Sequence, residues 1–232
     1  MIGFTANQAI EATGYKFLWF FARASCPRAL FRWAVLHKLM RMMTLFFWVI
    51  IIAQILATIS IVFSIWVPAH RIWPPDKPSS WKHYFMWFLF DISIIGIVFV
   101  GILDWGSLSL PPWTQIVAGV PLAVGGIAFA LWSIVILGPS STYGNEGPLI
   151  LRGPYRISRN PQYLGFIVAL IGWSLITSSR ATMLAAAVWI FPLVLIPFAE
   201  EPWLRWRHGS EYEDYLRKVP RFITIRKRNK VA

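Results

Sequence analysis

The sequence contains little of the chemistry that marks metal centres and soluble nucleotide-binding sites. It has one cysteine, Cys26, among 232 residues, which excludes an internal disulfide and any cysteine-rich metal site. Its four histidines have no metal-ligand spacing, so we predict no bound metal. Neither a GxGxxG motif after a strand nor a GxxxxGKS or GxxxxGKT motif is present, which excludes the usual glycine-rich phosphate loops.

Charged residues are scarce as well. They make up 14% of the chain, against 57% for hydrophobic residues, whereas soluble domains are about a quarter charged. Residues 44–67 contain no charged side chain and exceed the roughly 20 residues that cross a bilayer as a helix. Four further apolar blocks lie at 85–103, 113–137, 163–177 and 181–199. Because backbone groups in hydrocarbon must be satisfied internally, we predict an all-α, polytopic membrane bundle of about five transmembrane helices.

The last two blocks are separated by only three residues, 178–180, which predicts a tight antiparallel helical hairpin. The loop before this hairpin and the tail after it therefore share one side of the membrane. The loop contains three arginines, and the tail contains nine basic residues from Arg205 to Lys230. The positive-inside rule therefore predicts that this side is cytosolic. The same rule explains the net charge of +12, since basic loops also contact anionic lipid headgroups. We predict no nucleic-acid partner and no obligate protein partner.

The first 43 residues alternate aromatic and basic side chains, a pattern typical of amphipathic segments in the membrane interface. No signal peptide is evident there, so we expect the first span to act as the insertion signal. Five spans would place this basic segment on the far side, which the positive-inside rule disfavours, and its side stays open. We divide the chain into an interfacial segment (1–43), the first three transmembrane helices (44–137), and a loop, hairpin and tail (138–232).

A pair of adjacent glycines and one aspartate inside the predicted spans could have either a packing role or a functional role. Gly125 and Gly126 lie in the third span, and we interpret them as small residues that allow close helix packing rather than as a cofactor loop. Asp91 lies in the second span. A carboxylate within a span is costly and commonly functional, but a hydrogen-bonded packing role is equally open for Asp91.

The loop at 138–161 is long and contains three Gly-Pro pairs and one Asn-Pro pair. Long loops in compact proteins are usually functional or disordered, and this one leads directly into a span, which favours function. Prolines 192, 197 and 202 are expected to break the fifth helix, and broken backbone at membrane depth is tolerated mainly where it lines a cavity. Glu201 and Arg205 are one turn apart and can face that cavity, which suits a cationic, zwitterionic ligand.

An ordered series of residues runs through this part of the chain. It comprises Gly153, Pro154, Tyr155 and Arg156, then Arg159, Asn160, Pro161, Tyr163 and Gly165, and finally Glu200, Glu201, Leu204, Gly209, Tyr212, Tyr215, Val219, Pro220 and Arg221. In this series the chain resembles the isoprenylcysteine carboxyl methyltransferase and phospholipid N-methyltransferase superfamily. Asn160 stands where isoprenylcysteine enzymes usually carry histidine, and His208 replaces a frequent phenylalanine. Both departures concern the acceptor more than the cofactor.

The resemblance implies that the last hairpin and tail enclose S-adenosylmethionine near the cytosolic face, while a lipophilic acceptor or membrane lipid enters sideways. The first two spans are not expected to form this pocket. Residues that match cofactor-binding positions are Tyr155, Asn160, Pro161, Tyr163, Leu164, Glu200 and Glu201. Catalytic roles would fall to Glu201, Arg205 and Arg221, with an arginine holding a carboxylate of the cofactor or of an acidic acceptor. The acceptor stays open: a prenylcysteine, a phospholipid headgroup, a thiol and a small isoprenoid phenol or acid all fit.

The orientation of three site residues can be predicted. Adjacent carboxylates on a helix point about 100° apart, so Glu200 and Glu201 cannot face the same atom. We expect Glu201 to face the cavity, because Arg205 would otherwise be an uncompensated cation beside a sulfonium. Glu200 would then face an arginine or the interface. We expect Asn160 to start the fourth helix, where it can cap free backbone amides or reach the ligand.

Two alternative functions remain. Membrane NAD(P)H-dependent sterol or enone reductases resemble the same region, with an Arg-His-Pro-x-Tyr element and a tyrosine-rich tail; the Glu200–Glu201 pair favours methyl transfer. The second alternative is a non-catalytic membrane subunit or lipid-binding scaffold, which would not need the full set of motif positions.

Overall fold

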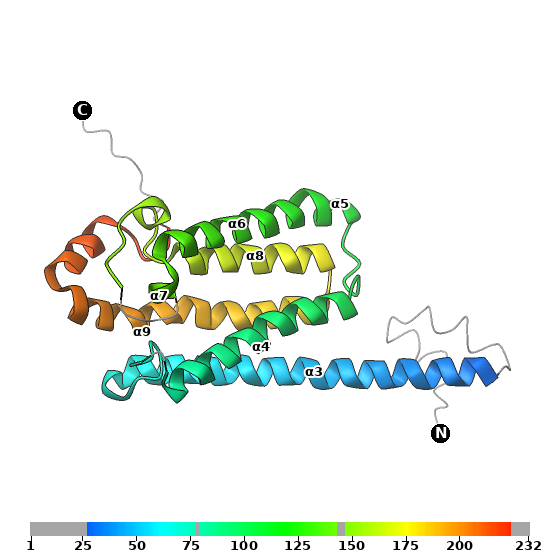
Figure 1. Ribbon diagram of the computed structural model, residues 1–232. Helices are drawn as coiled ribbons and strands as arrows, with labels where there is room; N and C mark the ends of the chain where they lie inside the picture. The colour runs from blue at the N-terminus through cyan, green and yellow to red at the C-terminus, as the bar shows by residue number, and fades with distance from the viewer. Residues whose placement is uncertain (1–26, 78, 143–146, 224–232) are drawn as a thin grey trace, which may run out of the picture. The chain divides into compact units, whose positions relative to one another are not determined.

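The computed structural model describes residues 27–77, 79–142 and 147–223 (Figure 1). Within these ranges all regular secondary structure is helical. The long helices are α3 (Pro27–Trp66), α4 (Trp81–Leu103), α6 (Val120–Leu137), α8 (Pro161–Thr177) and α9 (Arg180–Lys218). The short ones are η1 (Pro68–His70), α5 (Pro112–Thr114), η2 (Gln115–Gly119), α7 (Pro139–Thr142) and η3 (Gly153–Arg156). Elements α5, η2 and α6 follow one another without a break.

Four helical segments are long and apolar enough to cross a membrane. They are Met40–Trp66, Trp81–Leu103, Pro112–Leu137 and Arg180–Lys218. Helix α8 is apolar too but has 17 residues, the lower end of the length that spans a bilayer. These five segments coincide with the five predicted apolar blocks, which confirms the all-α fold of a multi-pass integral membrane protein.

The chain forms two compact units, residues 1–45 and 46–232, and the second contains every predicted site residue. Of the predicted interfacial segment, residues 1–26 lie outside the described residues. Helix α3 begins at Pro27, so that the remainder of that segment is helical and continues directly into the first span.

Helices α6 and α8 pack side by side through glycine (Figure 1). A methyl group added at Gly126 would overlap the backbone of Ala169, and one at Gly165 would come within 2.6 Å of the Ala130 nitrogen. Gly126 therefore has the predicted packing role, because only a residue without a side chain permits this approach. Gly125 faces open space instead, so the same prediction is wrong for it.

The turn between α8 and α9 is the predicted tight hairpin. Ser178 adopts a left-handed conformation with φ of 45°, and the Ser179 side chain accepts the amide hydrogen of Thr182 at 3.0 Å as the N-cap of α9. Asp104, which follows α4, accepts from the Ser179 hydroxyl at 2.6 Å and from the Ala181 amide at 3.0 Å. These bonds anchor the hairpin to the end of α4.

Helix α9 continues through its three prolines, so the prediction that they break it is wrong. A proline removes one backbone hydrogen bond, and neighbouring helices let a membrane helix tolerate that loss. The interruption lies at Gly209, whose φ of 53° and ψ of −129° are not helical and favour glycine. Beyond Gly209 the helix turns back toward η3 and the start of α8 (Figure 1), where the Tyr215 hydroxyl donates to the Tyr155 carbonyl at 2.7 Å.

Candidate active site

A cavity of about 100 Å³ lies at one end of the second unit and is called the polar cavity below, because charged and hydrogen-bonding side chains stand among its apolar walls. The chain reaches it from η3, from the start of α8 and from both sides of the Gly209 bend in α9. Tyr155, Arg159, Asn160, Tyr163, Glu200 and Tyr212 are among its walls. The structure therefore brings together residues that are up to 60 positions apart in the predicted series, from Tyr155 to Tyr215. Pro161 and Leu164 do not line this cavity; Pro161 occupies the first turn of α8, where its missing amide hydrogen has no cost.

Glu200 faces the cavity. Its Oε1 accepts hydrogen bonds from the Tyr163 hydroxyl at 2.7 Å and from the Trp73 Nε1 at 2.8 Å. No group among the described residues donates to Oε2. Because hydrogen bonds to a carboxylate are about twice as strong as neutral ones, the two donors fix the carboxylate and leave its second oxygen available to a ligand.

Glu201 faces away from the cavity and is 6% exposed. Arg221 binds it through a two-pronged pair, with Nε 2.8 Å from Oε1 and Nη2 2.6 Å from Oε2. Arg159 Nη1 lies 3.3 Å from the same Oε1. The Arg221 guanidinium also lies over the Phe198 ring, 3.8 Å from its centre, and its bonds to Glu201 raise the pKa of Arg221.

The predicted orientation of the two carboxylates is thus wrong: Glu200 faces the cavity, and Glu201 faces arginine. The physical reason is that a buried carboxylate needs paired, hydrogen-bonded cations. Two arginines from other segments meet at Glu201, whereas the prediction considered only Arg205 on the same helix. Arg205 itself is half-exposed, and its Nε lies 3.4 Å from Glu213 Oε1. It does not line the cavity, so its predicted place there is also wrong.

Arg159 is the cation that does line the cavity. Its side chain is 11% exposed, and its buried Nε has no hydrogen-bond partner among the described residues. Arg159 belongs to the ordered series of residues that carries the family resemblance, but no role was predicted for it. Nothing in the linear sequence distinguishes Arg159 from the neighbouring arginines at 152 and 156.

Asn160 lies at the start of α8, as predicted. Its side chain does not cap the helix; its Nδ2 donates to the Arg221 carbonyl at 3.0 Å. The Ser158 hydroxyl donates to that same carbonyl at 3.1 Å, and the Arg159 amide donates to the Pro220 carbonyl at 3.0 Å. These three bonds join the loop before α8 to the tail after α9.

Tyr155 is 5% exposed, and its hydroxyl has no hydrogen-bond partner in the part of the chain that the structure describes. Burial, the charge of Glu200 and the neighbouring Tyr215 raise the pKa of Tyr155. The phenol therefore stays neutral and can donate a hydrogen bond to a ligand in the cavity.

A second, apolar cavity of about 550 Å³ lies between α4, α6, α8 and α9. None of the described residues that line it is charged. Ile94 of α4 and Ile127 of α6 line it and are 42% and 50% exposed, so the cavity reaches the lipid-facing surface between these helices. Gln162 and Tyr163 line both cavities, so the two cavities share a wall at the first turn of α8.

The chain is similar in sequence to known methyltransferases. Residues 114–211 match the sequence model of the phospholipid methyltransferase family. The chain is 30% identical over 115 residues to the probable protein-S-isoprenylcysteine O-methyltransferases of Oryza sativa subsp. indica and subsp. japonica, and the match covers 46% of this chain and 60% of each rice protein. It is 34% identical over 74 residues to protein-S-isoprenylcysteine O-methyltransferase B of Arabidopsis thaliana, covering 31% and 37%.

These matches support a relationship between the chain and the isoprenylcysteine and phospholipid methyltransferase superfamily. It spans 60% of the length of its rice relatives. No solved structure matches it significantly.

Two residues at the candidate site precede the matched residues 114–211. Pro74 lines the polar cavity, and Trp73 lines the apolar cavity and binds Glu200. Both lie in the linker between α3 and α4, residues 67–80, where no site residue was predicted. A tryptophan among prolines gave no signal for a site residue, because its partner lies 127 positions further along the chain.

Proposed function

We propose that this protein transfers a methyl group from S-adenosylmethionine to a lipophilic acceptor at the cytosolic face of the membrane. The observation that carries the proposal is that two adjacent cavities, one with charged walls and one apolar, share Gln162 and Tyr163 as a common wall. A methyl transfer of this kind needs a polar cofactor and an apolar acceptor to meet at one point.

The unpaired groups of the polar cavity fit the cofactor. S-adenosylmethionine carries a carboxylate, an ammonium group, hydroxyls and an adenine ring. Arg159 Nε and the Tyr155 hydroxyl can donate to it, while Gln162 Oε1, also buried and unpaired within the described residues, can accept. Arg159 would hold the carboxylate, and Glu200 would hold the ammonium group.

The polar cavity is smaller than the roughly 300–1,000 Å³ of a typical small-molecule site. Residues 147–150 form one of its walls. Binding of the whole cofactor therefore requires this segment to shift outward, which is simpler for a loop without regular structure than for the packed helices on the other sides.

The bound cofactor supplies a methyl group activated by its sulfonium. The residues of this chain supply alignment and a dry environment. Glu200, fixed by two donors, would orient the polar end of the cofactor. The apolar walls would exclude water from the boundary between the two cavities. An amine acceptor would have to lose a proton, and Glu200 is the carboxylate that lines the polar cavity and could take it. A carboxylate acceptor needs no such base.

Glu201 and Arg221 have a supporting part in this proposal. Their ion pair, with Arg159, holds the tail against the loop before α8, and so closes one wall of the site. Of the residues predicted to be catalytic, these two act through neighbouring groups, while Arg205 pairs with Glu213 at the surface.

The apolar cavity favours an acceptor with an extended hydrocarbon chain. Its walls carry no charge, and it reaches the surface between α4 and α6, so that a lipid could enter from the bilayer. The relatives are named for isoprenylcysteine and the family for phospholipids; both substrates combine a polar group with such a chain.

Ligand binding to the purified protein tests the proposal. We expect S-adenosylmethionine to bind in a calorimetric titration, and NADPH to bind at least tenfold more weakly. Glu200→Ala should weaken the binding of S-adenosylmethionine about tenfold or more, since one decade corresponds to about 1.4 kcal/mol. Binding of NADPH in place of S-adenosylmethionine would instead identify a reductase, and binding of neither would favour a non-catalytic subunit.

A further inference from the structure

Trp73 lies outside the residues that match the family, yet its side chain reaches the candidate site. The indole is 2% exposed, and its Nε1 donates to Glu200 Oε1 at 2.8 Å. We propose that Trp73 is a positioning residue that fixes the Glu200 carboxylate at the boundary between the two cavities. Its effect on cofactor binding rests on the proposed function; its bond to Glu200 does not.

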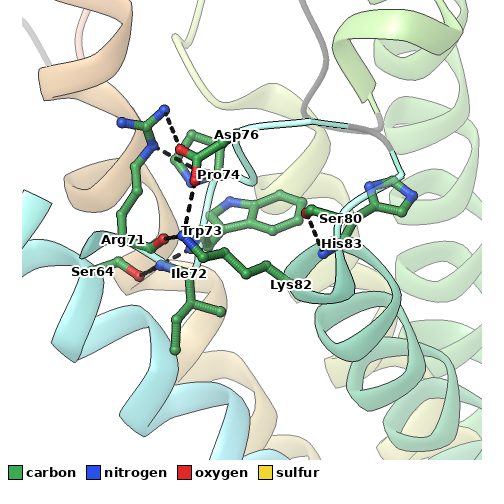
Figure 2. A network of polar contacts seen from close by, with 9 residues as sticks. All are labelled: Ser64, Arg71, Ile72, Trp73, Pro74, Asp76, Ser80, Lys82 and His83. Carbon is green, nitrogen blue, oxygen red and sulfur yellow. Dashed lines mark hydrogen bonds and ion pairs between the residues drawn. The ribbon is translucent and has the colours of Figure 1, made fainter. Parts of the chain in front are cut away.

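The backbone of Trp73 is held by the end of α3. Ser64 is buried, and its hydroxyl oxygen accepts the amide hydrogens of Ile72 and Trp73 at 2.9 and 3.0 Å. The same hydroxyl donates to the Ser60 carbonyl at 2.7 Å. One serine thus satisfies two consecutive amides and fixes the direction in which the indole leaves the backbone (Figure 2).

A ring of charged groups closes the linker around this point (Figure 2). Asp76 pairs with Arg71 at 3.0 Å and with Lys82 at 2.8 Å. Lys82 also donates to the Arg71 carbonyl at 2.8 Å, and Arg71 Nε donates to the Pro74 carbonyl at 3.0 Å. Ion pairs and hydrogen bonds therefore hold the linker on both sides of Trp73.

The ring system of Trp73 is held by aromatic neighbours. It lies edge-on to Phe90 and Trp87, with ring centres 5.4 and 6.4 Å apart. Edge-on pairs of this kind favour one orientation over others. Trp73 lines the apolar cavity, whereas the next residue, Pro74, lines the polar one, so these two residues form part of the partition between the cavities.

Trp73 therefore positions the Glu200 carboxylate in addition to packing against its apolar neighbours. Tyr163 and Trp73 come from different parts of the chain, and both donate to Oε1 of Glu200. Two donors on one oxygen define the plane of the carboxylate, which a single donor cannot do. Loss of the indole donor should let Glu200 rotate and weaken its hold on a cationic ligand.

A double-mutant cycle tests this role. In Trp73→Phe, which keeps the ring and loses the donor, the dissociation constant for S-adenosylmethionine should rise about three- to tenfold. Trp81→Phe is the matched control, because Trp81 is 65% exposed, and it should change the constant less than twofold. In a Glu200→Ala background the effect of Trp73→Phe should vanish, since coupled residues are not additive.

A second measurement needs no cofactor. The indole resonance that disappears from the ¹⁵N–¹H spectrum in Trp73→Phe should be shifted in Glu200→Ala and unchanged in Trp81→Phe. An unshifted resonance, or an equal loss of affinity from Trp73→Phe with and without Glu200, would overturn the positioning role. If the resonance shifts but S-adenosylmethionine does not bind, the positioning role stands and the proposed function fails.

Discussion

Glu200 and Glu201 are adjacent in the chain but have separate partners. Substitution of Glu200 should therefore affect ligand binding, whereas substitution of Glu201 should affect stability. Glu200 is bound by neutral donors and faces the polar cavity, whereas Glu201 is bound by guanidinium groups and faces the tail. The first arrangement leaves a carboxylate oxygen for a ligand, and the second uses its carboxylate to hold the fold.

Glu200→Gln should weaken S-adenosylmethionine binding about tenfold or more with little change in thermal stability. Glu201→Gln should lower stability by about 1.5–3 kcal/mol, the usual worth of hydrogen bonds to a charged group, with a smaller effect on affinity. Thermal unfolding and calorimetric titration of the two variants separate these outcomes. Arg205→Gln is the control, because an exposed ion pair contributes about 0–1 kcal/mol. Equal effects of both glutamate variants on affinity would contradict the assignment.

At the scale of elements, the contact between α6 and α8 depends on glycine at defined positions. Gly126→Val should destabilise the protein by about 1–3 kcal/mol or more, because its side chain would overlap the Ala169 backbone. Gly125→Val is a matched control one residue away, where nothing lies within 4 Å of the added methyl. Thermal unfolding followed by size-exclusion chromatography measures both. Similar stability of the two variants would contradict the helix contact.

The loop that borders the polar cavity should respond to the cofactor. We expect saturating S-adenosylmethionine to slow amide hydrogen exchange in residues 147–156, because binding orders the wall of the site. Residues 104–111, at the opposite end of α4, serve as the internal control and should not change. Protection restricted to the control segment would place the binding site elsewhere.

The elements were predictable to different degrees. The five apolar blocks and the 178–180 hairpin follow from the demand that a bilayer makes on backbone groups, and the structure has them. The course of α9 was not predictable, because its prolines look like breaks and Gly209 does not. That bend brings Arg221 onto Glu201, 20 residues earlier, so the orientation of the two carboxylates depended on it. The bond between Trp73 and Glu200 depends on packing between distant segments and leaves no local pattern.

At the scale of the whole molecule, we expect the basic residues near the site to set the membrane orientation, with the site on the cytosolic face. In a Cys26→Ser background, an impermeant thiol reagent applied to right-side-out vesicles should label Ser109→Cys, in the exposed loop after α4. Ser210→Cys, exposed beside the Gly209 bend, should be labelled only after permeabilisation. The reverse pattern would place the site on the outer face and contradict the positive-inside argument.

Methyl transfer itself tests the central claim most directly. Membranes that contain the protein are incubated with S-adenosylmethionine labelled in its methyl group, and the organic-extractable fraction is counted and separated. The account predicts label in a lipophilic product, at least tenfold less with Glu200→Ala and unchanged with Trp81→Phe. Label no higher than in membranes without the protein, or equal label with Glu200→Ala, would contradict it.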